Sequence, residues 1–530
     1  MKKTHVATVL ALALMMQIIS FSFGAVQATP QTHHWKHYVQ GKSFFDKKKY
    51  AEAAHELEHA VAQEKKTASY YLLLAKTYEQ LNQFQKASEN YYRAGELYKK
   101  SDYNAYLVNK MRGDALSSQI ELYAYEQAGP SSAKLAKHEP AHGLYIGAFV
   151  EYDAAIGPRN VQKFNQMTGK QHAMYFTYHK YGSPFPINWA NQVKQAGGAI
   201  QLALEPGSGL ASVRDDEYLR QFARDCKAFG APIFLRYAAE MNGPWVKWHG
   251  NPQQYIEKFR LVARVMKEEA PNVAMVWTPN SNPQNQIDRY YPGDAWVDWV
   301  GVNMYSVRFF NGDVTQPADH VNPLDLLDYV YKTYAARKPI MVAEYGATHY
   351  SAAGKQNTTT FSMNKMNMLY HGVKMKYPRV KSINWFSVNT INRSENPERK
   401  LNNFSISENS KVLVAYQTMI RDPYFLPSVQ SQGEANIAPL KNHRMAILQG
   451  KTITSVIDGH AWIKTYDPYI SRVEYKLDGK PMSVATQYPF KFKLDPTKLS
   501  KGVRKLEVIV FDSKQRKAAS KVVTFTVGGK

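Results

Sequence analysis

The spacing of hydrophobic and polar positions changes twice along the chain. Between about 35 and 127, apolar residues recur at helical spacing. From Gly143 to Tyr424, apolar runs of strand length alternate with amphipathic stretches of helix length, the pattern of parallel βα units. Beyond Tyr424, apolar and polar residues alternate with a period of two, which is typical of strands. The sequence therefore predicts a multidomain chain with a helical part, a βα part and an all-β part.

The helical part contains an internal repeat of 34 residues. It matches Gly41, Phe44, Ala53, Leu57 and Ala60 with Ala75, Tyr78, Ala87, Tyr91 and Ala94. The small residues let paired helices approach closely, and the large ones fill the groove between them. This pattern resembles the tetratricopeptide repeat, so we expect such repeats over 33–130, with 103–127 as a helical cap. Two interpretations stay open, a structural hairpin packed on the next domain and a docking surface for a partner protein.

The βα part contains eight candidate strands. They are Leu144 to Val150, Ala173 to Thr177, Ala199 to Leu204, Ile233 to Ala238, Val273 to Trp277, Trp299 to Met304, Ile340 to Ala343 and Ser382 to Phe386. Eight successive units predict a closed (β/α)₈ TIM barrel over 141–425. An open doubly wound sheet is the alternative, but no glycine-rich phosphate loop follows the first strand.

Residues 426–441 have the composition of a linker, and 442–530 predict a β-sandwich. Val473 to Leu477 alternates, the turn Asp478-Gly479 follows, and 505–510 alternates again. This domain resembles the immunoglobulin-like modules attached to bacterial surface hydrolases, although it lacks their cysteine pair. The single cysteine, Cys226, excludes an intramolecular disulfide.

Residues 1–28 have the features of a signal peptide, with two lysines, an apolar run and small residues before Ala28. We therefore expect a secreted or surface-associated protein, with an uncleaved membrane anchor as the alternative. The net charge of +23 favours a polyanionic partner, which for an exported protein is an anionic polymer of the cell envelope or an acidic polysaccharide. Nucleic acid is not expected, because no nucleic-acid-binding motif accompanies the dispersed lysines.

Two glutamates stand directly after apolar strands. Glu240 follows the fourth strand and Glu344 follows the seventh, and each precedes a loop that contains glycine. In TIM barrels the carboxyl ends of the strands carry the chemistry. Cleavage of a glycosidic bond needs one carboxylic acid and one carboxylate on opposite faces of the sugar. We therefore expect Glu240 as acid/base and Glu344 as nucleophile of a retaining enzyme.

The segment from Arg236 to Trp245, with Trp248, resembles the strand-four signature of family 26 glycoside hydrolases, and 343–346 resembles the nucleophile motif of that family. The resemblance covers about 143 to 425. It implies an endo-acting hydrolase of β-mannan, β-glucan or β-xylan that needs no metal or organic cofactor. Mannanases of the family typically have histidine before the acid/base, whereas this chain has Ala239, which weakens the assignment to mannan.

Further candidate residues surround this pair. The resemblance implies that Tyr305 hydrogen-bonds the nucleophile and that Trp385 forms the aromatic floor under the sugar. Arg236 points to the same side of its strand as Glu240 and can hold a carboxylate. The remaining candidates for substrate contacts are Glu205, Glu151, Asn242, Trp245 and Trp248. His249 and His349 lie nearby, but their spacing forms no metal motif, and no metal is expected.

Two functions follow from these features. The first is a secreted retaining endo-β-glycosidase acting on an extracellular or envelope polysaccharide. The second is a non-hydrolytic carbohydrate-binding scaffold in polysaccharide assembly or export, in which the helical repeats recruit a partner. Both glutamates favour the first function, whereas the repeats and Ala239 keep the second open.

Overall fold

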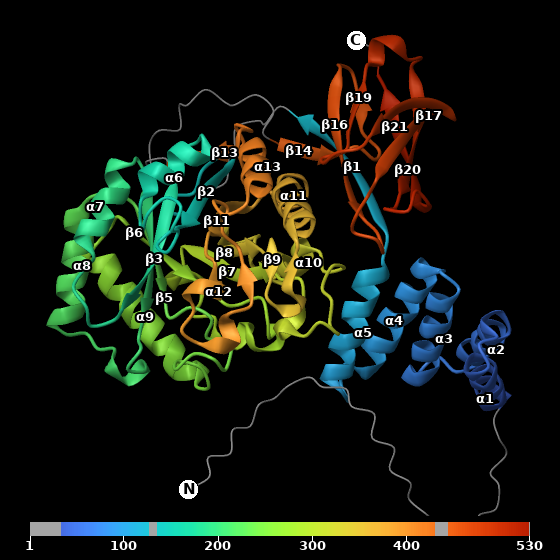
Figure 1. Ribbon diagram of the computed structural model, residues 1–530, viewed down its shortest axis with the longest axis horizontal. Helices are drawn as coiled ribbons and strands as arrows, with labels where there is room; N and C mark the ends of the chain where they lie inside the picture. The colour runs from blue at the N-terminus through green and yellow to red at the C-terminus, as the bar shows by residue number, and fades with distance from the viewer. Residues whose placement is uncertain (1–32, 127–134, 430–443, 529–530) are drawn as a thin grey trace, which may run out of the picture.

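The computed structural model describes residues 33–126, 135–429 and 444–528 (Figure 1). The predicted signal peptide and most of the predicted linker lie outside these ranges. Within them, no helix combines the length and the hydropathy that a membrane crossing requires.

The amino-terminal part of the described chain is helical. Its helices are α1 (His33–Asp46), α2 (Tyr50–Gln63), α3 (Ala68–Gln80), α4 (Phe84–Tyr98) and α5 (Tyr103–Leu116). The small residues of the repeat lie at the helix contacts, where Ala53, Ala75 and Ala87 are fully buried. At Gly41 a Cβ atom would lie 2.7 Å from Leu57 Cγ, so the two helices need glycine there. The predicted helical repeats are confirmed.

The segment after α5 differs from the expected helical cap over 103–127. The helix ends at Leu116, and Gln119–Glu126 form strand β1, which pairs with β14 (Arg444–Ile447) and β16 (Ile457–Lys464). Its side chains Ile120 and Leu122, two residues apart, enter the core of the carboxyl-terminal sheets. Pairing with strands far along the chain decides this structure, and local periodicity does not reveal such pairing.

Eight parallel strands close into a barrel. They are β2 (Leu144–Phe149), β3 (Met174–Lys180), β4 (Ala199–Glu205), β5 (Ile233–Tyr237), β6 (Val273–Trp277), β7 (Trp299–Ser306), β8 (Ile340–Ala347) and β11 (Val380–Phe386). Each strand pairs with the next, and β11 pairs with β2 to close the ring. The short strand β13 (Phe425–Leu426) adds to the start of β2. The predicted TIM barrel is confirmed, and its closure excludes the doubly wound sheet.

Helices cover the outside of the barrel (Figure 1). They include α6 (Val161–Thr168), α7 (Ile187–Gln195), α8 (Glu217–Phe229), α9 (Pro252–Glu269), α10 (Pro323–Tyr334), α11 (Thr359–Lys376) and α13 (Ser410–Ile420). The amino-terminal half of the barrel interior is apolar, with Met174, Phe234 and Met341 among its side chains. Above it, Gln201 and Asn384 donate to the backbone oxygens of Ala343 and Val342 at 3.2 and 3.1 Å. The interior is therefore a packed core that supports the strand ends.

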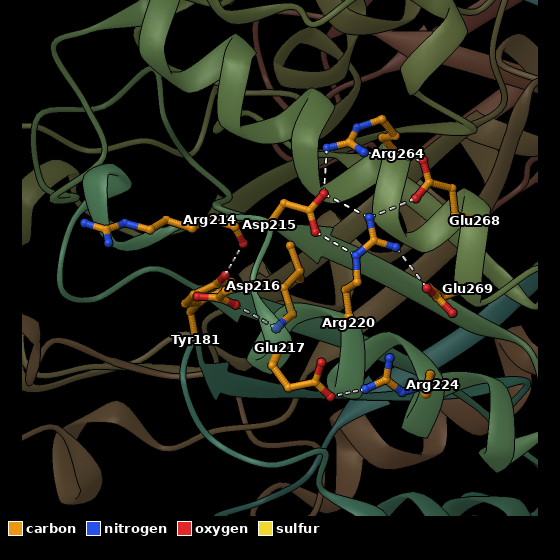
Figure 2. A network of polar contacts seen from close by, with 11 residues as sticks. Tyr181, Arg214, Asp215, Asp216, Glu217, Arg220, Arg224, Arg264, Glu268 and Glu269 are labelled. Carbon is orange, nitrogen blue, oxygen red and sulfur yellow. Dashed lines mark hydrogen bonds and ion pairs between the residues drawn. The ribbon is translucent and has the colours of Figure 1, made fainter.

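A network of charged side chains joins α8 to α9 on the outer surface (Figure 2). Arg220 pairs with Asp215 at 2.8 Å and with Glu269 at 2.9 Å, and Arg264 also pairs with Asp215 at 2.9 Å. Since these side chains are partly exposed, each pair contributes little stability. The network orients α8, which begins just after the loop that follows β4.

The carboxyl-terminal part consists mainly of antiparallel strands in two sheets. One sheet has the order β14-β1-β16-β19, and the other has the order β15-β21-β20-β17-β18. The strands not yet given are β15 (Thr452–Ile453), β17 (Arg472–Leu477), β18 (Lys480–Ala485), β19 (Lys491–Leu494), β20 (Gly502–Phe511) and β21 (Lys517–Val527). One apolar core joins the two sheets. The all-β domain is confirmed, while its immunoglobulin-like character stays a prediction.

The three parts contact one another through specific side chains. Lys464 of β16 pairs with Asp325 of α10 at 2.6 Å, and Lys464 is almost fully buried. Phe84 of α4 packs on Tyr466 with ring centroids 4.1 Å apart. The carboxyl-terminal sheets therefore contact both the helical repeats and the barrel.

Candidate active site

The sheet geometry places both predicted glutamates at the carboxyl end of the barrel. Glu240 comes three residues after β5 ends, and its backbone N–H donates to Thr278 O at 2.8 Å, just beyond β6. The pairing register between β7 and β8 shifts at this point. Val302 of β7 pairs with Val342 of β8, but the next residue of β7, Asn303, pairs with Glu344. Such a bulge adds one residue and re-aims the following side chain. Glu344 therefore turns towards the barrel axis, although simple alternation would point it outward.

Glu344 is held by three donors. Arg236 of β5 forms an ion pair with its Oε1, and Tyr178 at the end of β3 donates to the same oxygen at 2.7 Å. Tyr305 of β7 donates to Oε2. Burial and the neighbouring carboxylate raise the pKa of both phenols, so they stay protonated donors. Arg236 and Glu344 are 1% and 3% exposed, so the ion pair and the two hydrogen bonds hold the Glu344 carboxyl group in one position inside the barrel.

Glu240 has a different set of partners. Asn303 and Asn280 donate to its Oε1 at 2.8 and 3.0 Å, and the Trp245 indole donates to its Oε2 at 2.6 Å. These donors are neutral, in contrast to the guanidinium at Glu344. The backbone at Ala238 and Glu240 has φ of 46° and 60°, a conformation that non-glycine residues rarely adopt. Strain of this kind is often found at functional sites.

Three residues in these contacts, Tyr178, Asn280 and Asn303, were absent from the predicted site residues. Tyr178 lies one residue beyond the predicted end of its strand, but β3 continues to Lys180 and keeps Phe176 and Tyr178 on one face. Asn280 comes three residues after β6, where its amide reaches Glu240. A polar residue just beyond a barrel strand was the signal that could have identified Asn280.

A third carboxyl group lies beside the pair. Glu205 ends β4, close enough to Arg236, Glu344 and Glu240 for their charges to act on it. Burial raises the pKa of Glu205 to about 7, because it outweighs the lowering effect of the Arg236 charge. Glu151, by contrast, accepts from Thr177 and from Arg159 in contacts internal to the protein.

The predicted aromatic floor at Trp385 is wrong. Asn384 points into the barrel, where it hydrogen-bonds, so Trp385 points outward and Phe386 points inward. Trp385 is fully buried and donates to Phe404 O at 2.9 Å. Phe386 stacks on Phe149 with centroids 5.1 Å apart and meets the edge of Tyr305 at 5.6 Å. On β11, the aromatic ring that lies nearest to Glu344 and its donors is therefore that of Phe386.

Two other predicted substrate contacts are buried. Trp248 is 6% exposed and donates to Ala239 O at 2.7 Å, so it holds the backbone before Glu240. Asn242 is fully buried and binds the backbone of Asn280 in both directions, with both distances 2.9 Å. Both residues support the acid/base and leave no surface for a sugar. Trp245 is 47% exposed, and its indole is in place beside Glu240.

The histidines near the site bind backbone oxygens. His249 lies 2.8 Å from Met241 O, and His349 lies 2.9 Å from Ser405 O. In the ranges that the structure describes, no three His, Cys, Asp or Glu side chains are grouped so that they could hold a metal ion. The site therefore presents the buried carboxyl group of Glu344 beside the partly exposed carboxyl group of Glu240.

Comparison with known proteins points to one family. Residues 189–375 match the model of Glycosyl hydrolase family 26, which confirms the resemblance seen in the barrel motifs. An endoglucanase H of Acetivibrio thermocellus is 24% identical over 300 residues, 52% of this chain and 30% of its own length. A β-1,3-xylanase of a Vibrio species is 32% identical over 174 residues, 28% of this chain and 37% of its own length. The chain thus spans about a third of each of these two relatives.

Among solved structures, an endo-β-1,4-mannanase double mutant of Cellulomonas fimi matches 72% of this chain and 94% of its own, with a TM-score of 0.40 and 13% identity. A β-mannanase of Bacteroides ovatus matches 54% of this chain and 90% of its own, with a TM-score of 0.38 and 14% identity.

Proposed function

Because residues 189–375 match glycosyl hydrolase family 26, we propose that this protein is a retaining endo-β-glycosidase, with Glu344 as nucleophile and Glu240 as acid/base. The observation that carries the proposal is the contrast between the two carboxyl groups. Glu344 binds a guanidinium and two phenols, whereas Glu240 binds two amides and an indole. A double displacement needs one carboxylate that attacks the sugar and one carboxyl group that exchanges a proton, and the guanidinium partner supports the first role for Glu344.

In the first step, Glu344 attacks the anomeric carbon while Glu240 gives its proton to the glycosidic oxygen. The bond from that carbon to the leaving sugar breaks, and an ester forms between the sugar and Glu344. In the second step, Glu240 removes a proton from water, whose oxygen attacks the same carbon and releases Glu344. Each step leaves both carboxyl groups in the state that the next step requires.

The substrate that we propose is a neutral β-linked polysaccharide. The relatives named above act on β-glucan and β-1,3-xylan according to their names, and Ala239 stands where mannanases of the family typically carry histidine. We therefore rank β-glucan and β-xylan above mannan. The predicted signal peptide supports export, so the polysaccharide lies outside the cell or in its envelope.

The test is release of reducing ends from mannan, mixed-linkage β-glucan, β-1,3-xylan and the exopolysaccharide of the source organism. Wild type, Glu344→Gln and Glu257→Gln are compared, since Glu257 is an exposed glutamate of α9 whose side chain is 64% accessible. We expect wild type and Glu257→Gln to hydrolyse at least one polymer and Glu344→Gln to lose several orders of magnitude in kcat. Equal rates for wild type and Glu344→Gln on every polymer would overturn the proposal. Binding without hydrolysis by wild type would instead favour the scaffold function.

A further inference from the structure

Helix α5 of the helical repeats and two loops of the barrel enclose a cavity of about 140 Å³. From α5 the lining residues are Leu107, Lys110, Met111, Asp114 and Ala115. From the barrel they are Ser281, Asn282 and Gln284 after β6, and Phe310, His320, Val321, Asp325 and Leu326 after β7. Figure 1 shows α5 as the repeat helix that faces the barrel beside α10. The repeats and the barrel therefore line one cavity together, and it is open to solvent on the side of Met111, which is 44% exposed.

A second cavity of about 190 Å³ lies beside this space. The two cavities share the lining residues Ser281, Asn282, Phe310, Val321 and Leu326. The second cavity also reaches Asn280 and Tyr305, which hydrogen-bond Glu240 and Glu344 respectively. The residues that line the two cavities therefore extend from α5 to two side chains that contact the catalytic pair.

The cavity at α5 offers the groups that a sugar ring uses. Leu107, Met111 and Phe310 supply apolar surface for the C–H face of a pyranose, and Asn282 and Gln284 supply amides for its hydroxyl groups. Mixed apolar and amide surfaces of this kind are suited to an uncharged, hydroxyl-rich ligand.

The charges that line the cavity are already balanced within the protein. Asp114 accepts from Tyr92 at 2.6 Å and pairs with Lys110 at 2.7 Å, and Asp325 pairs with Lys464 at 2.6 Å. A charged ligand would have to displace one of these partners, so the cavity favours a neutral one. The same contacts join α5 to α4 and β16 to α10, so both sides of the wall are held in place before any ligand arrives.

We infer that this cavity is a distal sugar-binding subsite of the catalytic cleft, to which the helical repeats contribute through α5. Its occupant is a neutral β-glycan whose chain also lies across Glu240 and Glu344. The inference rests on the proposed function, and it gives the repeats a part in substrate binding. Long chains gain affinity from the subsite, whereas chains too short to reach it do not.

The test is calorimetric titration with hexasaccharides and trisaccharides of the β-1,4-glucan, β-1,4-mannan and β-1,3-xylan series. Every protein carries Glu344→Gln so that the ligand survives. In this background Met111→Trp fills the cavity, and Val108→Trp is the matched control, because Val108 is exposed on α5 but does not line the cavity. Gln284→Ala removes one amide without adding bulk, which covers the case in which Met111→Trp does not fold.

We expect Met111→Trp to weaken binding of a hexasaccharide about tenfold and Gln284→Ala to weaken it about threefold, while the trisaccharide of that series binds as before. Val108→Trp should match the parent for both lengths. Three results would overturn the subsite. They are unchanged hexasaccharide affinity in both cavity variants, an equal loss of affinity for hexasaccharide and trisaccharide, and no binding of any hexasaccharide. Wild-type turnover is measured separately, so length-dependent binding without hydrolysis would defeat the proposed function and leave the subsite standing.

Discussion

Asn303 Nδ2 lies 2.8 Å from Glu240 Oε1, so an asparagine of β7 holds the candidate acid/base. The Oδ1 atom of the same side chain accepts from Arg236 at 3.2 Å, and Arg236 pairs with Glu344. One asparagine therefore connects the two carboxyl groups across the barrel mouth. The proton donor and the nucleophile are positioned by a single network.

Replacing Asn303 should misplace the acid/base. Asn303→Ala removes the hydrogen bond to Glu240 and also the one from the charged Arg236, which is of a kind that contributes about 1.5–3 kcal/mol, so kcat should fall about 10- to 100-fold on the polymer that wild type hydrolyses. Asn104→Ala, at an exposed position of α5, is the control. Steady-state kinetics check this, and a kcat within twofold of wild type would show that the amide does not position Glu240.

Tyr178 should matter to catalysis, although it was not among the predicted site residues. Tyr178→Phe removes the 2.7 Å hydrogen bond to Glu344 and leaves the ring in place. We expect kcat to fall about tenfold or more, with the thermal midpoint little changed. Tyr152→Phe is a matched control, because Tyr152 is an exposed tyrosine that packs on Phe149 at the same mouth. Equal losses in the two variants would contradict the role of the Tyr178 hydroxyl.

The two aromatic residues that end β11 should differ in what they disturb. Trp385→Ala should destabilise the fold by about 3–5 kcal/mol, because it empties a fully buried site. Phe386→Ala should raise KM or lower kcat with a smaller loss of stability, because this ring faces the barrel mouth. Urea denaturation and kinetics on both variants separate these effects. The reverse pattern would restore Trp385 as the sugar platform.

The sequence predicted the strands well because each barrel strand is a buried apolar run whose length and order are set locally. It failed at β1, where pairing with distant strands decides the structure. It also failed at Trp385, since a shift of one residue along a strand exchanges the inward and outward faces. Trp248 and Asn242 lie in the matched motif, but whether a motif residue contacts substrate or supports the backbone depends on tertiary packing. Glu240 and Glu344 were identified because each follows an apolar run and precedes a glycine, a pattern visible in sequence, although β8 continues past Glu344 to Ala347.

Glu205 should make stability depend on pH. Its pKa is about 7 in the folded protein against 4.5 for an ordinary glutamate, so between these values the folded state holds a proton that the unfolded chain has released. The free energy of unfolding therefore falls as the pH rises from about 4.5 to about 7. Glu205→Gln should remove this contribution and be more stable than wild type at pH 8 by about 1–3 kcal/mol, with little difference at pH 4.

Denaturant titrations at pH 4, 6 and 8 measure this difference, with Glu257→Gln as the control. A wild-type advantage over Glu205→Gln that grows with pH would mean that Glu205 is ionised and stabilising in the folded protein. The raised pKa would then be wrong.

The most direct test of the central claim is the anomeric configuration of the first product. Proton NMR follows hydrolysis of a β-linked oligosaccharide from the series that wild type cleaves, before mutarotation mixes the anomers. Attack by Glu344 followed by attack of water gives two inversions, so the new reducing end should appear first as the β anomer. An α anomer as the first product would show a single displacement by water and would contradict Glu344 as the nucleophile.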